Sequence, residues 1–222
     1  MYLLSKMINN IREKCYKCYR PITSCMCKYV NQITTNTKFV ILMHPKEFRK
    51  TKNGTGHFTH LSLPNSEIFV GIDFNNHIKI NNLLNDKNNN CFVLYPDTTS
   101  INLNTHSIKE DNKTNVIFII DSTWPCSHKI LAVSKNISAL QKISFTHNKL
   151  SQFKIKMQPN HYCLSTIEST QVVLELLNQH NIENIDLKDI EAFIQPFQEM
   201  VKYQVTCATK TTGKQPRFLR RD

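Results

Sequence analysis

Short runs of apolar, largely β-branched residues recur along the chain, and polar or amphipathic stretches separate them. Apolar runs of this length are typical of strands that are buried on both faces of a sheet. The run 115–120, Asn-Val-Ile-Phe-Ile-Ile, predicts a fully buried strand. In chain order, strands are expected at 38–43, 68–72, 91–95, 115–120 and 143–145, with a half-exposed strand or a loop at 153–156.

Helical signals alternate with these runs. Ser165 and Glu168 have the spacing of a capping box and predict a helix that reaches about His180. Asp186 starts the last helix, in which apolar residues recur at i, i+3 and i+4 and Pro196 should cause a kink or a division. Strands that alternate with helices predict an α/β fold with a mainly parallel sheet. Short helices are also expected at 78–84 and 129–133, whereas 50–60 and 98–114 are expected to be loops.

The stretch 121–126, Asp-Ser-Thr-Trp-Pro-Cys, directly follows the strand expected at 115–120. Ligands of open α/β sheets gather at the carboxyl ends of the strands, so Asp121, Thr123 and Trp124 are candidate active-site residues. The alternative is that Asp121 or Thr123 only caps the following helix. Position alone does not decide between the two interpretations.

Composition and charge narrow the class of protein. Hydrophobic residues make up 40% and charged residues 20% of the 222 residues, as is usual for globular proteins, and no apolar run is long enough to span a bilayer. The net charge of +11 favours a polyanionic partner, with nucleic acid ahead of an anionic membrane surface. No secretory signal is recognised, so we expect a reducing, cytoplasmic location.

Four cysteines form a C-x2-C-x6-C-x-C pattern near the start of the chain: Cys15, Cys18, Cys25 and Cys27. Two close thiolate pairs can surround one tetrahedral zinc ion, and four protein thiolates leave no open position for catalysis. We therefore expect a structural zinc site, the alternatives being free thiols or two disulfides. The other four cysteines are expected to be buried small residues: Cys91, Cys126, Cys163 and Cys207.

Glycine is scarce, with four residues, and neither G-x-G-x-x-G nor the phosphate-binding loop of nucleoside triphosphatases occurs. A nucleotide-like ligand must therefore be held in another way. Besides Asp121 and Thr123, other expected strand ends carry residues that suit a ligand site: His44 and Glu47, then Tyr95 and Asp97. Each has a simpler explanation, such as a turn residue, but together they suggest one active site at the carboxyl edge of the sheet.

These motifs together resemble the DTW-domain proteins. The resemblance lies in Cys15-x2-Cys18-x-Arg20-Pro21 before Cys25-x-Cys27, in H-P-x-E at 44–47, in L-Y-P at 94–96, in D-x-T-W at 121–124 and in S-T-x-E at 165–168. The motifs occur in the family order and cover most of residues 15–205. The family comprises tRNA-uridine aminocarboxypropyltransferases related to the SPOUT methyltransferases. The resemblance therefore implies a SPOUT-like fold with a C-terminal knot.

The implied reaction moves the 3-amino-3-carboxypropyl group of S-adenosylmethionine to N3 of a tRNA uridine and releases 5′-methylthioadenosine. Bacterial relatives suggest the variable-loop uridine at position 47. Uridine N3–H must lose its proton before the nitrogen can attack, and a carboxylate can act as the general base. Asp121 is the candidate base. Thr123 and Trp124 would contact the amino-acid moiety, although Trp124 could equally be a core aromatic residue.

The resemblance also implies where the cofactor and the RNA bind. S-adenosylmethionine would be held by the residues of D-x-T-W and by two loops, Leu94-Tyr95-Pro96-Asp97 and Ser165-Thr166-x-Glu168. Family members usually have arginines in place of Lys154 and Lys156, and an arginine is also expected at His57. Lysine cannot form the bidentate contacts of arginine, so the RNA contacts depart from the family pattern. The expected tRNA contacts are His44, Glu47, Lys154, Lys156, Arg217 and Arg220.

We thus expect a zinc-binding segment at 1–36, a catalytic domain at 37–207 and a basic tail at 208–222. The competing functions are an S-adenosylmethionine-dependent RNA methyltransferase and a non-catalytic, zinc-dependent RNA-binding protein. A membrane-surface role ranks last, because no amphipathic anchor or lipidation motif accompanies the basic tail. The sequence does not decide between a monomer and a homodimer.

Overall fold

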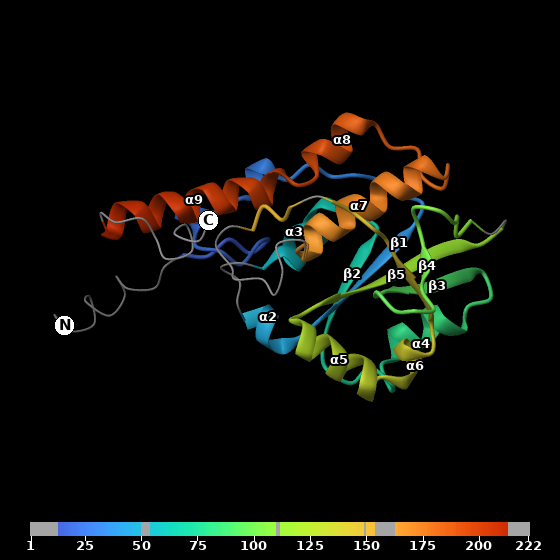
Figure 1. Cartoon of the computed structure of the whole chain (residues 1–222). Coiled ribbons are helices and arrows are strands. Elements are labelled where there is room, and N and C mark those ends of the chain that lie inside the picture. The colour runs from blue at the N-terminus through green and yellow to red at the C-terminus, as the bar shows by residue number, and fades with distance from the viewer. Residues whose placement is uncertain (1–12, 50–53, 110–111, 149, 154–162, 213–222) are drawn as a thin grey trace.

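The computed structural model describes residues 13–49, 54–109, 112–148, 150–153 and 163–212 (Figure 1). Its centre is a six-stranded sheet with the order β2-β1-β5-β3-β6-β4, in which every pairing is parallel. The expected α/β fold with a parallel sheet is confirmed. The strands are β1 (Lys38–Met43), β2 (Ser66–Val70), β3 (Asn89–Leu94), β4 (Ile101–Asn102), β5 (Thr114–Asp121) and β6 (Gln141–Ser144).

Helices cover both faces of the sheet (Figure 1). Alternate residues of each strand face opposite layers: Phe39 and Ile117 join one apolar cluster, and Val40 and Phe118 join the other. The first layer contains α3 (Thr55–Ser62), α7 (Thr166–Gln179), α8 (Leu187–Ala192) and α9 (Gln195–Thr212). The second contains α4 (Ile78–Asn85), α5 (Trp124–Val133) and α6 (Lys135–Ser138), while α2 (Pro45–Arg49) follows the end of β1.

The register of the central strands sets the geometry of the carboxyl edge. β1 and β5 pair so that Met43 lies opposite Asp121. The two strands therefore end at the same level, and the backbone N–H of His44 donates a hydrogen bond of 3.1 Å to the carbonyl of Asp121. This pairing fixes the backbone of Asp121 at the centre of the edge.

Most of the expected elements are present. The strand at 38–43 and the helix after Ser165 are confirmed, and the last helical region is divided between α8 and α9 just before Pro196. Helix α5 starts at Trp124 rather than at Lys129, with Pro125 in its first turn. The strand expected at 68–72 begins two residues earlier, at Ser66.

Two expected loops are wrong in part. Residues 55–62 form helix α3, which is largely buried; many of its inward residues are small or polar, such as Gly56, Thr59 and Ser62, so the sequence shows little apolar periodicity there. The loop expected at 98–114 contains β4, which has only two residues and is too short to show an alternating pattern.

The connection between β3 and β4 spans a strand that comes later in the chain, because β6 lies between them in the sheet. The expected knot depends on the path after β6, which includes residues 154–162 outside the described ranges, and it stays a prediction. The division into three segments also stays a prediction; α9 continues past its boundary at residue 207 to Thr212. Within the described ranges, no helix combines the length and the apolar character required to cross a bilayer.

Candidate active site

An open cavity of about 510 Å³ lies at the carboxyl edge of the sheet, where β3, β5 and β6 end and α7 begins. It brings together residues that are far apart in the sequence and that come from four of the motifs described above. The expected site residues that line it are Glu47, Leu94, Tyr95, Pro96, Asp121, Thr123, Trp124, Ser165 and Thr166. Three others do not line it: His44, Asp97 and Glu168.

Asp121 is the acidic residue at the end of the central strand. It is 7% exposed, and the hydroxyl of Thr166, in the first turn of α7, donates a hydrogen bond of 2.6 Å to its Oδ1. The residue at the N-cap of α5 is Thr123, whose side chain makes no capping bond. The carboxylate of Asp121 is therefore oriented by α7, and the interpretation of these two residues as side-chain caps is not supported.

Gly56, in the first turn of α3, lies against the carboxylate of Asp121. A β-carbon at this glycine would lie 2.4 Å from Oδ2 and 2.8 Å from Cγ of Asp121, and 2.9 Å from Cε of Met43. No side chain fits in that space. The glycine thus allows the positive end of the α3 dipole to approach the carboxylate.

Substitution Gly56→Ala should displace the carboxylate and reduce kcat/KM by about 10- to 100-fold, because a catalytic group misplaced by about 1 Å can have an effect of that size. The matched control is Gly71→Ala, whose β-carbon would lie 2.9 Å from the ring of Phe74 and outside the cavity lining. Steady-state kinetics and thermal melting of both variants test this expectation. Normal kcat/KM in Gly56→Ala would show that this close approach does not matter for the reaction.

Trp124 lies at the cavity with its side chain 41% exposed, so the alternative of a core aromatic residue is wrong. Its ring meets the ring of Tyr95 edge-on, with centroids 5.9 Å apart. The hydroxyl of Tyr95 lies 3.1 Å from Nδ1 of His128, one turn further along α5. These contacts hold the indole in place from one side and leave much of it accessible to a ligand.

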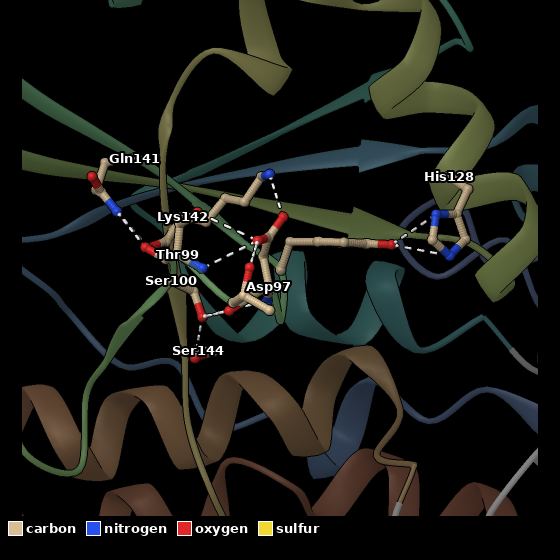
Figure 2. A network of polar contacts seen from close by, with 9 residues as sticks. Asp97, Thr99, Ser100, His128, Gln141, Lys142 and Ser144 are labelled. Carbon is tan, nitrogen blue, oxygen red and sulfur yellow. Dashed lines mark hydrogen bonds and ion pairs between the residues drawn. The ribbon is translucent and has the colours of Figure 1, made fainter.

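Asp97 does not line the cavity. Its polar contacts stabilise the loop after β3 (Figure 2). The ammonium group of Lys142 contacts its Oδ2 at 2.6 Å, and the backbone N–H of Thr99 donates to its Oδ1 at 3.1 Å. The Lys142 ammonium group, followed by the Thr99 N–H, holds the pKa of Asp97 well below its usual value. In the same loop, the Ser100 hydroxyl lies 2.7 Å from that of Ser144 in β6. Asp97 therefore fixes the loop 94–97 against β6, and its expected cofactor contact stays a prediction.

Glu168 completes the expected capping box, since its Oε2 accepts hydrogen bonds from the N–H and the hydroxyl of Ser165 at 2.8 and 2.6 Å. The same carboxylate accepts a bond of 2.7 Å from the N–H of Gln152 and one of 2.9 Å from the hydroxyl of Ser151. Glu168 is 4% exposed. It therefore ties the segment 151–153 to the start of α7 and acts on the cavity only indirectly, through Phe153 in the lining.

Substitution Glu168→Gln should lower the free energy of unfolding by about 2–4 kcal/mol, because an amide nitrogen would face groups that donate to the carboxylate. Urea denaturation measures this change. Glu191→Gln, at an exposed position of α8, is the matched control and should change stability by less than about 0.5 kcal/mol. Equal midpoints for the two variants would contradict a structural role for the Glu168 carboxylate.

Sequence reasoning missed part of the cavity lining. His147 follows the strand expected at 143–145, so the rule that selected Asp121 could have found it, whereas Thr55 of α3 and Ser169 of α7 come from other elements. Cys163 lines the cavity. The expectation that the four cysteines outside the motif are buried is wrong, because Cys91, Cys126 and Cys163 are partly exposed and Cys207 is exposed. The missed lining residues with polar or aromatic side chains include Thr55, Ser144, Phe145, His147 and Ser169.

His44 is buried, with 5% exposure, and its Nδ1 accepts a hydrogen bond of 3.1 Å from the N–H of Lys46 at the start of α2. Burial lowers the pKa of His44, the cations Lys46, Lys129 and Arg49 lower it further, and Glu47 opposes them. The expected RNA contact at His44 is therefore not supported, because the side chain faces inward. The other expected RNA contacts, Lys154, Lys156, Arg217 and Arg220, lie outside the described residues.

The four cysteines of the N-terminal motif converge, with all four sulfur atoms within 4.8 Å of one another: Cys15, Cys18, Cys25 and Cys27. Sγ of Cys15 lies 3.7 Å from that of Cys27, and Sγ of Cys18 lies 3.8 Å from that of Cys25. Sulfur atoms at the corners of a zinc tetrahedron lie about 3.8 Å apart, whereas a disulfide requires about 2.05 Å. The cluster therefore fits a metal ion and contains no disulfide.

The pKa values of the thiols in this cluster are also shifted by their surroundings. The backbone N–H of Cys18 is the main cause that lowers the pKa of Cys15, to about 6, whereas burial raises the pKa of Cys18. Buried thiols that resist ionisation become thiolates when a metal ion binds. Tyr19, with a φ of 58°, makes the tight turn between the first cysteine pair and Arg20.

The cysteine segment packs on the domain that contains the cavity. Cys15 and Cys18 belong to the same apolar cluster as Phe58 of α3 and Phe197 of α9. Arg20 is 2% exposed; its Nε donates to the carbonyl of Ser24 at 2.9 Å, and its guanidinium group lies 5.9 Å from the centre of the Phe58 ring. The segment is thus an integral part of the fold.

Comparison with known proteins agrees with this geometry. The DTW domain matches residues 12–205. The chain is 25% identical over 198 residues to tRNA-uridine aminocarboxypropyltransferase 2 of Mus musculus, covering 87% of this chain and 64% of that protein. It is 27% identical over 203 residues to the protein of the same name in Drosophila melanogaster, covering 88% and 76%. The chain thus spans about two thirds of the length of these relatives, and no solved structure matches it.

Proposed function

Because the chain belongs to the DTW-domain family, we propose that it is a tRNA-modifying transferase, which moves the 3-amino-3-carboxypropyl group of S-adenosylmethionine to N3 of a uridine. The relatives named tRNA-uridine aminocarboxypropyltransferase support the class of reaction. The single observation that carries the proposal is the cavity, in which residues of D-x-T-W, L-Y-P and S-T-x-E meet around Asp121. Modification at uridine 47 is part of the proposal and follows from the family resemblance alone.

The size and lining of the cavity suit the proposed donor. Its volume of about 510 Å³ lies within the range of about 300–1,000 Å³ that is usual for small-molecule sites. S-adenosylmethionine would lie between the loop with Leu94, Tyr95 and Pro96 and the start of α7 with Ser165 and Thr166. Backbone groups of these loops would take the place of a glycine-rich phosphate loop, which this ligand, lacking phosphate, does not need.

The proposed chemistry assigns the proton to Asp121. Its carboxylate would remove the proton from N3, and N3 would attack the propyl carbon that is bonded to the sulfonium ion. A bond between N3 and this carbon forms, the carbon–sulfur bond breaks, and its electron pair neutralises the sulfur, which leaves as 5′-methylthioadenosine. Thr166 holds the carboxylate in one orientation at 2.6 Å. Thr123 and Trp124 would orient the amino-acid moiety so that this carbon, and not the methyl group, faces N3.

The cysteine cluster would hold a structural zinc ion. The four sulfur atoms have the mutual distances of a tetrahedral site, and all four positions would be filled by protein ligands. The ion would stabilise the tight turns of this segment and the buried contacts of Arg20. We assign it no part in the transfer reaction.

The remaining assignments are parts of the same proposal. We propose that Glu47 lies near the RNA, because it lines the cavity. The charges of Lys154, Lys156, Arg217 and Arg220 suit contacts with phosphates. We propose a cytoplasmic location, as expected from the sequence. The oligomeric state is left open between a monomer and a homodimer.

The decisive experiment is mass spectrometry of tRNA nucleosides after incubation of the purified protein with S-adenosylmethionine and unmodified tRNA. We expect aminocarboxypropyluridine and an equal amount of 5′-methylthioadenosine, both dependent on the tRNA. S-adenosylhomocysteine with a methylated nucleoside would instead identify a methyltransferase. No product, combined with tight tRNA binding, would favour the non-catalytic RNA-binding protein.

A further inference from the structure

Three aromatic rings from separate elements meet beside the cavity. Tyr19 comes from the cysteine segment, Phe48 from α2 and His57 from α3. The centroid of His57 lies 5.5 Å from that of Tyr19 and 5.6 Å from that of Phe48, and the two outer rings lie 6.4 Å apart. His57 is 5% exposed, whereas Tyr19 is 47% and Phe48 is 40% exposed. We call the two exposed rings, supported by His57, the ring platform.

The ring platform combines accessible apolar area with a fixed position. Each outer ring contacts a buried histidine in the first turn of α3, so neither ring can turn inward without displacing it. Large aromatic side chains that stay half exposed on a rigid support are typical of surfaces that bind a partner. The neighbours Glu47 and Thr55 line the cavity, which places the platform directly at its side.

Positive charge surrounds this part of the surface. Lys46 and Arg49 flank Phe48 on α2, and Lys129 lies on α5; all three are exposed. Burial is the main cause that lowers the pKa of His44; the three cations lower it further and Glu47 opposes them, so three cations and one carboxylate lie near the end of β1. The cysteine segment adds exposed Lys17 beside Tyr16, whose side chain is 81% exposed. Flat apolar rings among cations complement the bases and phosphates of a single-stranded nucleic acid.

We propose that Tyr19 and Phe48 stack with bases of an unpaired segment of the substrate RNA, whose phosphates contact Lys46, Arg49 and Lys129. The inference rests on the proposed function and extends it to the path of the RNA. A base that reacts at N3 must be unpaired, since N3–H takes part in base pairing, and its neighbours then expose their faces for stacking. The platform would hold these neighbours while the target uridine enters the cavity.

The first test removes the rings and keeps their apolar contacts with His57. In the double variant Tyr19→Leu and Phe48→Leu, the affinity for unmodified tRNA, measured by fluorescence anisotropy, should fall roughly 25-fold or more, because each of the two lost stacking contacts contributes about 5-fold or more. Phe48→Tyr, which keeps the ring, should bind within about twofold of the wild type. Thermal melting must show that the variants are folded. If the leucine variant does not fold, the charge variants described next decide the question.

The second test removes the cations. Each lost phosphate contact should reduce the slope of log K against log salt by about 0.7, so Lys46→Ala, Arg49→Ala and Lys129→Ala together should reduce it by about 2. The matched control removes the same charge from three exposed positions, two just before β3 and β5 and one at the start of α6: Lys87→Ala, Lys113→Ala and Lys135→Ala. This control should retain most of the slope.

The outcomes separate this inference from the proposed function. Folded ring and charge variants that bind and modify tRNA like the wild type would overturn the stacking surface and leave the transferase intact. A platform that serves a protein partner would give that same result. Wild-type protein that makes no modified nucleoside, while the ring variants lose RNA affinity, would overturn the transferase and support the RNA surface.

Discussion

Substitution Asp121→Asn should reduce the rate of transfer by about 10²- to 10⁴-fold, the usual contribution of a general base, and leave tRNA affinity within a few-fold. Asparagine has nearly the same shape and can still accept the hydrogen bond from Thr166, so the cavity should be preserved. It cannot accept the N3 proton. Single-turnover experiments with tRNA and S-adenosylmethionine measure the chemical step apart from binding.

Two further variants test whether the effect belongs to the carboxylate. Asp86→Asn changes an exposed aspartate in the turn before β3 and should leave the rate unchanged. Thr166→Val removes the hydroxyl that orients Asp121 and should give a smaller loss than Asp121→Asn, because the base is still present. A wild-type rate in Asp121→Asn would show that another group, or water, takes the proton.

Substitution Cys15→Ser should remove the metal ion and destabilise the protein more than it changes the chemistry. A structural zinc site contributes directly to folding, and a loss of about 3–5 kcal/mol corresponds to a decrease in Tm of roughly 6–20 °C for a chain of this size. Elemental analysis of the purified protein gives the metal content, and thermal melting gives the stability. The rate of transfer, measured well below the Tm, should remain within about tenfold of the wild type.

The control for this variant is Cys207→Ser, an exposed cysteine on α9 that lies outside the cluster. It should keep both the metal content and the Tm of the wild type. Removal of the metal from the wild type with a chelator should reproduce the Tm of Cys15→Ser. Metal-free Cys15→Ser protein with an unchanged Tm would count against a structural metal site.

The fold was predictable where a buried element is made of consecutive apolar residues. The run at 115–120 is buried on both faces of the sheet, and its β-branched composition reveals this without tertiary information. Helix α3 shows the opposite case. It is buried, but glycine and hydroxyl residues form much of its inward surface, so the pattern is that of a polar loop. Its stability comes from contacts with α7 and β1 that a local pattern does not reveal.

The part of the site at the end of a single strand was predictable, because the strand pattern alone indicates both the residue and its place at the edge of the sheet. Asp121 follows directly from the end of β5, whereas its contacts with Thr166 and Gly56 join segments that are at least 45 residues away in the sequence. Asp97 and Glu168 were also candidate site residues, but hydrogen bonds inside the protein occupy their carboxylates. A sequence shows that an acidic residue is present and does not show which groups compete for it.

The cysteine segment has one consequence for the way this chain is made. Residues 15–29 are synthesised well before α9, on which the helical turn at Cys27–Tyr29 packs. At a translation rate of about 5–20 residues per second, α9 is synthesised roughly ten seconds or more after this segment. During that time its thiols and apolar side chains are accessible to oxidants and to other chains. Early capture of a metal ion would protect them, so metal supply during translation should influence how much of the protein folds correctly.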